Sequence, residues 1–265
     1  MPAAGGEGGN AAQPNGRQRQ HVDGKSTMLG FRLGMPVISL LHAVPYSRLL
    51  DSKKQQCKER SRMFTGIVQG MAEVVAIEER TDFRTHQVRL PAGLEAGLEL
   101  GASVAHNGCC LTVTALEGQL ASFDLMRETL RLTNLGELEV GSVVNVERAA
   151  RFGDEIGGHS MSGHVMAMVT IDAIEATADN RRIWFQAPAE LMRFLFDKGY
   201  VGLDGVSLTI GEVQGTRFCV NLIPETLERT LMGVRAVGDQ VNLEVDPQTQ
   251  AIVETVERVM ASRLA

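Results

Sequence analysis

Apolar and polar side chains alternate along two stretches of the chain. In 111–125 the alternation is divided by the turn signal Glu117-Gly118, and it returns in 208–222 around Gln214-Gly215. Alternation with a period of two is typical of strands that have one face in a core. The pattern therefore predicts short antiparallel strands in a small barrel. The predicted inward positions are Leu111, Val113, Ala115, Ala121, Phe123, Leu125, Leu208, Ile210, Phe218, Val220 and Leu222.

One short helix is expected to interrupt each set of strands. Pro224 suits the first position of a helix, and Leu227 gives that helix an apolar contact. Gly233 is predicted to end this segment in the left-handed conformation. In the earlier stretch Arg127 stands in place of the proline, and Gly136 is the predicted terminator.

The last twenty residues have helical spacing. Asp246 and Pro247 form an N-cap and first-turn pair. Such a helix usually packs on its own domain, but two closed barrels leave it little vacant core. We therefore expect residues 247–265 to self-associate through their apolar stripe. The stripe consists of Ile252, Val256, Val259 and Arg263, with Val253, Met260 and Leu264 beside it.

The chain repeats itself without a gap at an offset of 97 residues, as from Gly66 to Gly163. Glycines, a proline and a tripeptide all keep this register, which predicts a duplicated domain of roughly 90 residues. Only two copies are present, so a solenoid is not expected. Matched pairs include Val68 with Val165, Pro91 with Pro188, Gly108 with Gly205, Leu111-Thr112 with Leu208-Thr209, Glu128-Thr129-Leu130 with Glu225-Thr226-Leu227, Asn145 with Asn242, and Glu147 with Glu244.

Composition excludes two classes of protein. The net charge of −6 and the aromatic content of 5% argue against a nucleic-acid binder, which normally has a basic surface. No apolar run reaches the roughly 18–20 residues of a membrane-spanning helix. The four cysteines form no C-x-x-C pair, so a reducing, cytoplasmic location is expected.

Residues 1–62 differ from the rest of the chain. They hold ten Lys or Arg against four acids, and the first 27 residues are rich in Gly, Gln, Asn and Ala, which predicts disorder. A transit peptide is one interpretation of this basic leader. The favoured one is a translated upstream stretch with the functional start at Met63. No chemistry is assigned to this segment.

Polar residues at matched positions are the first candidates for a site. Each hydroxyl or amide taken singly is best explained as a surface group, but together they predict one binding pocket made twice. The matched sets are Thr112 with Thr209, Asp124 with Asn221, and Thr129 with Thr226. Other pairs differ, so two like molecules would be bound and treated unequally. These are Cys110 against Ser207, Asn107 against Asp204, Ile67 against His164, and Ser103 against Tyr200.

Other chemistries have weak support. His159, His164, Cys109 and Cys110 are metal-capable, but they lack any established ligand spacing, and no metal is expected. Gly157-Gly158 belongs to no phosphate-binding motif and is interpreted as an interdomain turn. No G-x-S-x-G elbow is present, which disfavours a serine hydrolase.

Five motifs resemble the riboflavin synthase family of the alpha-chain type, most closely its bacterial members. They are MFTGIVQG at 63–70, GASVAHNGCCLTVT at 101–114, DEIGGHSMSGH at 154–164, DGVSLT at 204–209 and LIPETLERT at 222–230. The resemblance covers residues 63–265. It implies an all-β fold of two similar six-stranded antiparallel Greek-key barrels, at 63–158 and 159–246. It also implies a C-terminal α-helix at 247–265 that assembles a homotrimer.

The resemblance also implies the reaction, EC 2.5.1.9, the last step of riboflavin biosynthesis. Two molecules of 6,7-dimethyl-8-ribityllumazine dismutate by transfer of a four-carbon unit, giving riboflavin and 5-amino-6-(D-ribitylamino)uracil. One substrate is oxidised as the other is reduced, so no cofactor is expected. Two adjacent sites of one shape would make the encounter effectively unimolecular. The alternatives are a non-catalytic lumazine- or flavin-binding protein of the same fold and a purely structural trimeric adaptor.

Site residues follow from the resemblance, position by position. The first-copy pocket is expected to comprise Gly66, Ile67, Val68, Cys110, Leu111, Thr112, Asp124, Leu125, Met126, Arg127, Glu128 and Thr129. The second is expected to comprise Gly163, His164, Val165, Lys198, Asp204, Ser207, Leu208, Thr209, Asn221, Leu222, Ile223, Pro224, Glu225 and Thr226. Phe64 is expected to shield the site. In the family, the site forms where the first barrel of one subunit meets the second barrel of its neighbour.

Catalytic roles are narrower. The first step should remove a proton from the 7-methyl group, and His164 is the first candidate for that proton. Cys110, Ser103 and Ser207 are candidates for activating or delivering the nucleophile that adds at C7 of the other molecule. Expected partners are the lumazine substrate, riboflavin as product, further copies of the chain, and lumazine synthase.

Overall fold

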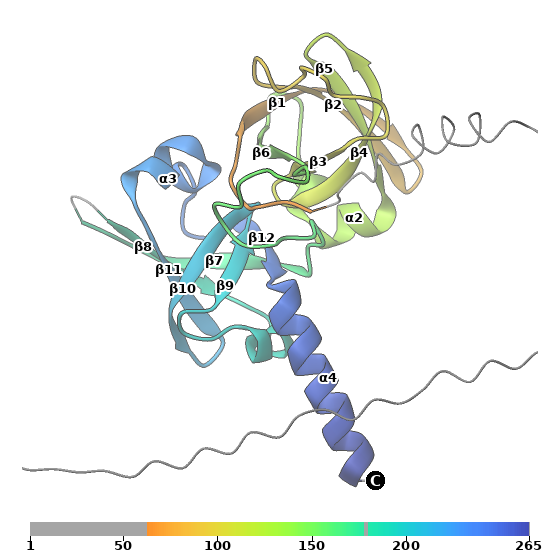
Figure 1. Cartoon of the computed structure of the whole chain (residues 1–265). Coiled ribbons are helices and arrows are strands. Elements are labelled where there is room, and N and C mark those ends of the chain that lie inside the picture. The colour runs from red at the N-terminus through yellow and green to blue at the C-terminus, as the bar shows by residue number, and fades with distance from the viewer. Residues whose placement is uncertain (1–62, 178–179, 265) are drawn as a thin grey trace, which may run out of the picture. The chain divides into compact units, whose positions relative to one another are not determined.

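The computed structural model describes residues 63–177 and 180–264, so the predicted leader lies outside the described residues. The described chain forms two closed antiparallel barrels of six strands each (Figure 1). The first, in the order β1-β2-β5-β4-β3-β6, consists of β1 (Gly70–Arg80), β2 (Phe83–Arg89), β3 (Ser103–His106), β4 (Cys109–Glu117), β5 (Leu120–Met126) and β6 (Val143–Arg148). The second, in the order β10-β11-β8-β7-β12-β9, consists of β7 (Ala167–Ala176), β8 (Arg181–Gln186), β9 (Tyr200–Leu203), β10 (Val206–Gln214), β11 (Arg217–Leu222) and β12 (Gln240–Val245).

The two barrels confirm the duplication strand by strand. The bounds of β3, β4 and β6 become those of β9, β10 and β12 at the offset read from the sequence. Because the circular strand order is also the same, the second barrel repeats the Greek-key connections of the first. Each barrel has its own apolar core, centred on Phe123 in the first and on Phe185 and Phe218 in the second. The predicted fold class is therefore confirmed.

The predicted inward face holds at every listed position except Ala115. Leu111 and Val113 of β4 are buried, but Ala115 is exposed, and Leu116 is turned partly inward instead. The pairing of β4 with β5 shifts register between Val113 and Ala115, and β10 shifts in the same way between Ile210 and Val213. A bulge adds one residue to the strand and so reverses the alternation beyond it.

The short helices are α2 (Arg127–Leu132), followed by the 3₁₀ turn η1 (Asn134–Glu137), and α3 (Pro224–Arg229), followed by η3 (Leu231–Gly233). Pro224 takes the first helical position, as predicted. The prediction for Gly136 and Gly233 is wrong, because neither has a positive φ. Glycine is needed at both positions for a steric reason. A Cβ at either position would collide with a helix carbonyl, that of Leu130 or Leu227.

The C-terminal helix α4 (Pro247–Leu264) begins at the predicted cap, since Asp246 accepts a hydrogen bond from the Thr249 backbone N–H at 3.1 Å. It runs out from the second barrel (Figure 1). Val253 packs on that barrel's core, and Arg193 of the 3₁₀ turn η2 (Ala189–Phe194) pairs with Glu257 at 2.7 Å. The remaining apolar stripe is exposed: Ile252, Val256, Val259, Met260 and Leu264. Among the described residues, no helix is long and apolar enough to cross a membrane.

Candidate functional site

The two barrels meet through their β3–β4 and β9–β10 hairpin turns. The turns are Asn107-Gly108 and Asp204-Gly205, and all four residues have positive φ, as this two-residue turn requires. The glycines touch across the joint. A Cβ on Gly108 would lie 2.7 Å from the backbone nitrogen of Gly205, and one on Gly205 would lie 2.8 Å from that of Gly108. Glycine is therefore needed here for close approach as well as for conformation.

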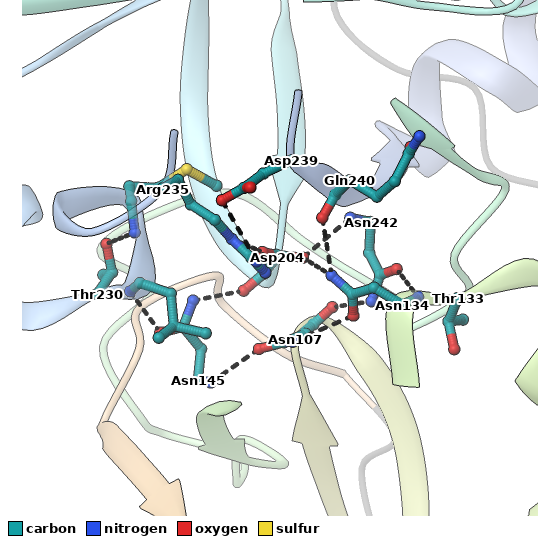
Figure 2. A network of polar contacts seen from close by, with 12 residues as sticks. Asn107, Thr133, Asn134, Asn145, Asp204, Thr230, Arg235, Asp239, Gln240 and Asn242 are labelled. Atoms are coloured by element: carbon teal, nitrogen blue, oxygen red, sulfur yellow. Dashed lines mark hydrogen bonds and ion pairs between the residues drawn. The ribbon is translucent and has the colours of Figure 1, made fainter. Parts of the chain in front are cut away.

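Two matched asparagines fasten the joint by the same bonds in opposite directions (Figure 2). Asn145 Nδ2 donates to the Asp204 carbonyl, and Asn242 Nδ2 donates to the Asn107 carbonyl, both at 2.9 Å. Their Oδ1 atoms accept from backbone N–H groups of the opposite barrel, at Leu231 (2.9 Å) and Asn134 (2.8 Å). The joint is therefore an approximate twofold axis between the two copies.

Asp204 breaks this symmetry. Its fully buried carboxylate accepts from Asn134 Nδ2 and from the Asn242 backbone N–H, both at 2.9 Å, and is paired with Arg235 (Figure 2). Burial raises the pKa of the Asp204 carboxyl, against the opposing effect of the Arg235 charge. The expected place of Asp204 in the second pocket is corrected here. Both of its oxygens are bonded within the joint, which makes it a joint group rather than a ligand-facing one.

A buried carboxylate holds the segment that precedes each barrel. Glu147 accepts from the Thr65 backbone N–H (2.6 Å), the Thr65 hydroxyl (2.8 Å) and the Gly66 N–H (3.0 Å). Glu244 accepts from Ser162 and Gly163 at the same three distances. Burial raises the pKa of the Glu147 carboxyl to about 7, against the effect of these donors. The two carboxylates therefore fix residues 65–66 and 162–163 in equivalent positions.

These segments cross from one copy to the other. Phe64 and Met161, which are matched residues, pair across the joint, each donating its N–H to the other's carbonyl at 2.9 Å. Beyond this pair, the Ser207 N–H donates to the Gly66 carbonyl (2.8 Å), and the Cys110 N–H donates to the Gly163 carbonyl (2.9 Å). Each barrel wall is therefore extended by a segment of the other copy.

The crossing corrects the expected composition of the two pockets. Val68 packs against the core of the second barrel, and Val165 packs against that of the first. We call β4, which contains Cys110, the first wall (or Cys110 wall), and β10, which contains Ser207, the second wall (or Ser207 wall). Gly66 and Val68 therefore lie beside the Ser207 wall, whereas Gly163 and Val165 lie beside the Cys110 wall. The physical reason is the Phe64–Met161 pairing, which directs each segment onto the opposite barrel. The sequence repeat could not reveal this, because matched positions look alike whichever barrel they contact.

The remaining predicted residues fall into three groups by exposure. The side chains of Leu111, Leu125, Leu208 and Leu222 belong to the barrel cores, and Phe64 is buried against Ala105 and Met161. Ser103, Cys110, Thr129, Ser207 and Thr226 are partly exposed. Exposed on the two outer faces are Ile67, Thr112, Asp124, Met126, Arg127, Glu128, His164, Lys198, Thr209, Asn221, Ile223, Pro224 and Glu225. These faces are open in a single chain.

Two predicted residues on these faces have a notable local geometry. Lys198 has φ of 68° in the matched position of Gly101, whose φ is 75°. A lysine in this left-handed region is uncommon, and such strain is often kept for function. Asp124 accepts from the Thr85 hydroxyl at 2.8 Å. The carboxylate is thereby oriented on the first barrel's outer face.

His159 contacts Ser207, although the sequence analysis named it only as a possible metal ligand. Its Nδ1 is 2.6 Å from Ser207 Oγ, and its ring stacks on Tyr200 with centroids 5.2 Å apart. Burial lowers the pKa of His159, so its ring is neutral at neutral pH. Among the described residues, no group of three or more His, Cys, Asp or Glu side chains could hold a metal ion.

The sequence analysis did not identify the structural role of several residues that hold the joint and the crossed segments. Glu147, Glu244, Asn145 and Asn242 were recognised as repeated, but no role was assigned to them. Their signal was available: each is a polar residue inside a strand, it is kept in both copies, and it directly follows an apolar residue. His159 had no such signal, because its partner is far away in the sequence.

The family model described as the lumazine binding domain matches this chain twice, at residues 65–149 and 162–246. The chain is 61% identical over 202 residues to the riboflavin synthase of Escherichia coli (strain K12), covering 76% of this chain and 95% of that protein. It is 42% identical over 205 residues to the riboflavin synthase of Mycobacterium bovis, covering 76% and 99%.

Two solved structures of LumP are similar in fold. LumP complexed with 6,7-dimethyl-8-(1'-D-ribityl) lumazine has a TM-score of 0.63 and 28% identity. LumP complexed with riboflavin has a TM-score of 0.64 and 30% identity. Both alignments cover 69% of this chain and 98% of LumP.

Proposed function

The chain belongs to the riboflavin synthase family, and from that premise we propose how its two barrels share the work. The reaction is the dismutation of two 6,7-dimethyl-8-ribityllumazine molecules, a four-carbon transfer that gives riboflavin. The observation that carries the proposal is the twofold joint with its crossed segments, because it builds two walls of one shape and different chemistry. Each wall binds one lumazine molecule.

The open faces supply the binding groups. Thr112 and Asp124 on the first barrel, and Thr209 and Asn221 on the second, are exposed at matched positions and offer hydrogen bonds to ribityl or ring atoms. The exposed apolar side chains of Met126 and Ile223 flank them. Binding two copies of one molecule in fixed poses removes much of the entropic cost of their encounter.

The reacting groups differ between the walls. His164 is exposed on the segment that lies against the Cys110 wall, and we assign it the 7-methyl proton. Ser103 and Cys110 on the first wall and Ser207 on the second are the groups assigned to activation of the nucleophile that adds at C7. No cofactor is required, since the electrons pass between the two substrates.

A neighbouring subunit, that is, a second molecule of this chain, completes the site. Both faces are open in one chain, and α4 presents an uncovered apolar stripe. We propose a homotrimer assembled by α4, in which the first barrel of one copy faces the second barrel of the next. A chain ending at Asp246 should lose its oligomeric state in size-exclusion chromatography, whereas an unchanged state would refute the assignment to α4.

Two further elements belong to the proposal. We place the protein in the cytoplasm, on the ground of its cysteine pattern. Lumazine synthase is the proposed partner, because its product is the substrate consumed here. Co-purification of the two from cell extracts tests the partner.

The decisive experiment mixes the full chain with 6,7-dimethyl-8-ribityllumazine alone and follows riboflavin fluorescence. Riboflavin formed without any added cofactor supports the proposal. Tight binding without product would support the alternative, a non-catalytic lumazine- or flavin-binding protein. Absence of both binding and product would contradict every lumazine-based interpretation.

A further inference from the structure

The His159–Ser207 pair is held rigidly where the first-copy segment meets the second barrel. The His159 N–H donates to the Thr65 carbonyl at 3.1 Å, and the Ser207 N–H donates to the Gly66 carbonyl at 2.8 Å. His159 is 7% exposed, and its imidazole stacks on Tyr200 with an angle of 12° between the rings. The 2.6 Å contact between Nδ1 and Oγ is therefore fixed by main-chain and ring contacts on both sides.

Only one nitrogen of this ring is used within the described part of the chain. His159 Nε2 is buried there without a hydrogen-bond partner. A buried N–H without a partner costs more than a buried acceptor without one, so the favoured tautomer has its proton on Nδ1. Nδ1–H then donates to Ser207 Oγ. Since this hydroxyl oxygen is already an acceptor, its own proton is free to point to the pocket.

The described residues at the matched positions of the first barrel are of different chemical types. Ser207 is matched by Cys110, whose thiol is only a weak donor, and Tyr200 is matched by Ser103, which offers no ring to stack on. The second wall therefore carries the stronger hydrogen-bond donor. A donor fixed in advance stabilises negative charge that develops on a bound molecule.

We propose that His159 is a positioning residue that directs the Ser207 hydroxyl toward the pteridine on the second barrel, which makes that pteridine the one that ionises. Ser207 then serves as a hydrogen-bond donor to the ionising ring, and activation of the nucleophile is left to Ser103 and Cys110 on the first wall. In this step a C–H bond of the 7-methyl group breaks and its electron pair is delocalised into the ring. The proton passes to His164 beside the first wall of the neighbouring subunit. The inference rests on the proposed function, in which the two walls face each other.

Deuterium exchange at the 7-methyl group tests this directly. Full-chain protein and lumazine are mixed in D₂O, and the initial rate of exchange is followed by ¹H NMR in unreacted lumazine. His159→Phe keeps the ring stack but removes the donor, so exchange should fall about tenfold, the equivalent of one hydrogen bond. Ser207→Ala should fall by a similar factor. The double variant should fall no further than the larger single effect.

Rescue separates positioning from a structural role. His159→Asn places an amide N–H near the position of Nδ1–H and should restore exchange to within about threefold of the unmodified protein. Lumazine affinity, measured by fluorescence titration, should stay within about twofold in all variants. His86→Ile, which removes a buried histidine outside both walls, is the matched control and should leave exchange unchanged.

Two results would overturn the inference: normal exchange in Ser207→Ala, or exchange as slow in His159→Asn as in His159→Phe. The Ser207→Ala result decides the matter even if His159→Phe does not fold. Failure of the proposed function looks different. In that case the unmodified protein itself makes no riboflavin in the same sample.

Discussion

The two barrels have the same strand topology but different buried side chains. Inside the first barrel lie His86, His106 and Phe123, and the ring centroids of His106 and Phe123 are 4.3 Å apart. The second barrel has Ile183, Leu203 and Val220 at the matched positions, all fully buried. The joint bonds of Asn145 and Asn242 and the contacts of Glu147 and Glu244 are nevertheless equivalent in both copies. The difference teaches that one barrel topology and one joint are compatible with different buried side chains in the two interiors.

The largest expected effect comes from the joint itself. Gly108→Ala and Gly205→Ala place a Cβ against the opposite backbone as well as straining a positive φ, so each should lower the free energy of unfolding by at least about 4 kcal/mol. Gly118→Ala has the same conformational strain in open space and should cost about 1 kcal/mol. Urea unfolding compares the three. Equal losses would show that the close approach is unimportant.

Acid should distinguish the two interiors next. Burial lowers the pKa of His86 to about 4 and that of His106 to about 3, from a value of 6.5. As pH falls below 6.5, the unfolded chain takes up protons that the folded barrel excludes, so stability is lost toward pH 4 and then pH 3. Each histidine should cost on the order of 3 kcal/mol at pH 4.

Exchanging one interior residue tests that comparison. His86→Ile should remove its share of the loss between pH 7 and pH 4, measured by urea unfolding at both values. Ile183→His should transfer acid sensitivity to the second barrel, because it buries a neutral imidazole there. An acid loss that His86→Ile leaves unchanged would show that the first barrel's histidines are not its cause.

The joint asparagines should give a smaller and symmetric effect. Asn145→Ala and Asn242→Ala each leave a buried carbonyl and a buried N–H without their cross-barrel partner, which should cost about 2–3 kcal/mol. The two values should agree within about 0.5 kcal/mol, since the bonds are equivalent. Chemical denaturation measures both, with the exposed Asn180→Ala as control. A large difference between the two losses would show that the equivalent bonds do not contribute equally to stability.

The walls should respond in catalysis rather than in stability. Cys110→Ser gives the first wall the hydroxyl of the second, and His164→Gln removes the assigned proton acceptor. Each should lower riboflavin formation about tenfold or more, which corresponds to about 1.4 kcal/mol, with lumazine binding mostly intact. Steady-state kinetics and fluorescence titration check this. Unchanged turnover in both variants would remove these roles but not the fold.

Much of the fold was readable from the sequence, because the repeat that relates Gly66 to Gly163 and the alternation around Phe123 can be recognised without knowing which segments are in contact. The bulge that exposes Ala115 was not readable, since register depends on the partner strand. The crossed segments were also missed. Their bonds join residues such as Gly66 and Ser207, and a repeat cannot say whether a matched contact lies within a copy or between copies.

Because of the crossed segments, a substitution in one half of the chain alters the structure of the other half. A substitution in residues 66–68 reshapes the wall that contains Ser207, and one in 163–165 reshapes the wall that contains Cys110. A change in either half therefore also alters the proposed lumazine-binding wall of the other half. Engineering one cavity for a new pteridine therefore requires libraries that vary distant parts of the gene together.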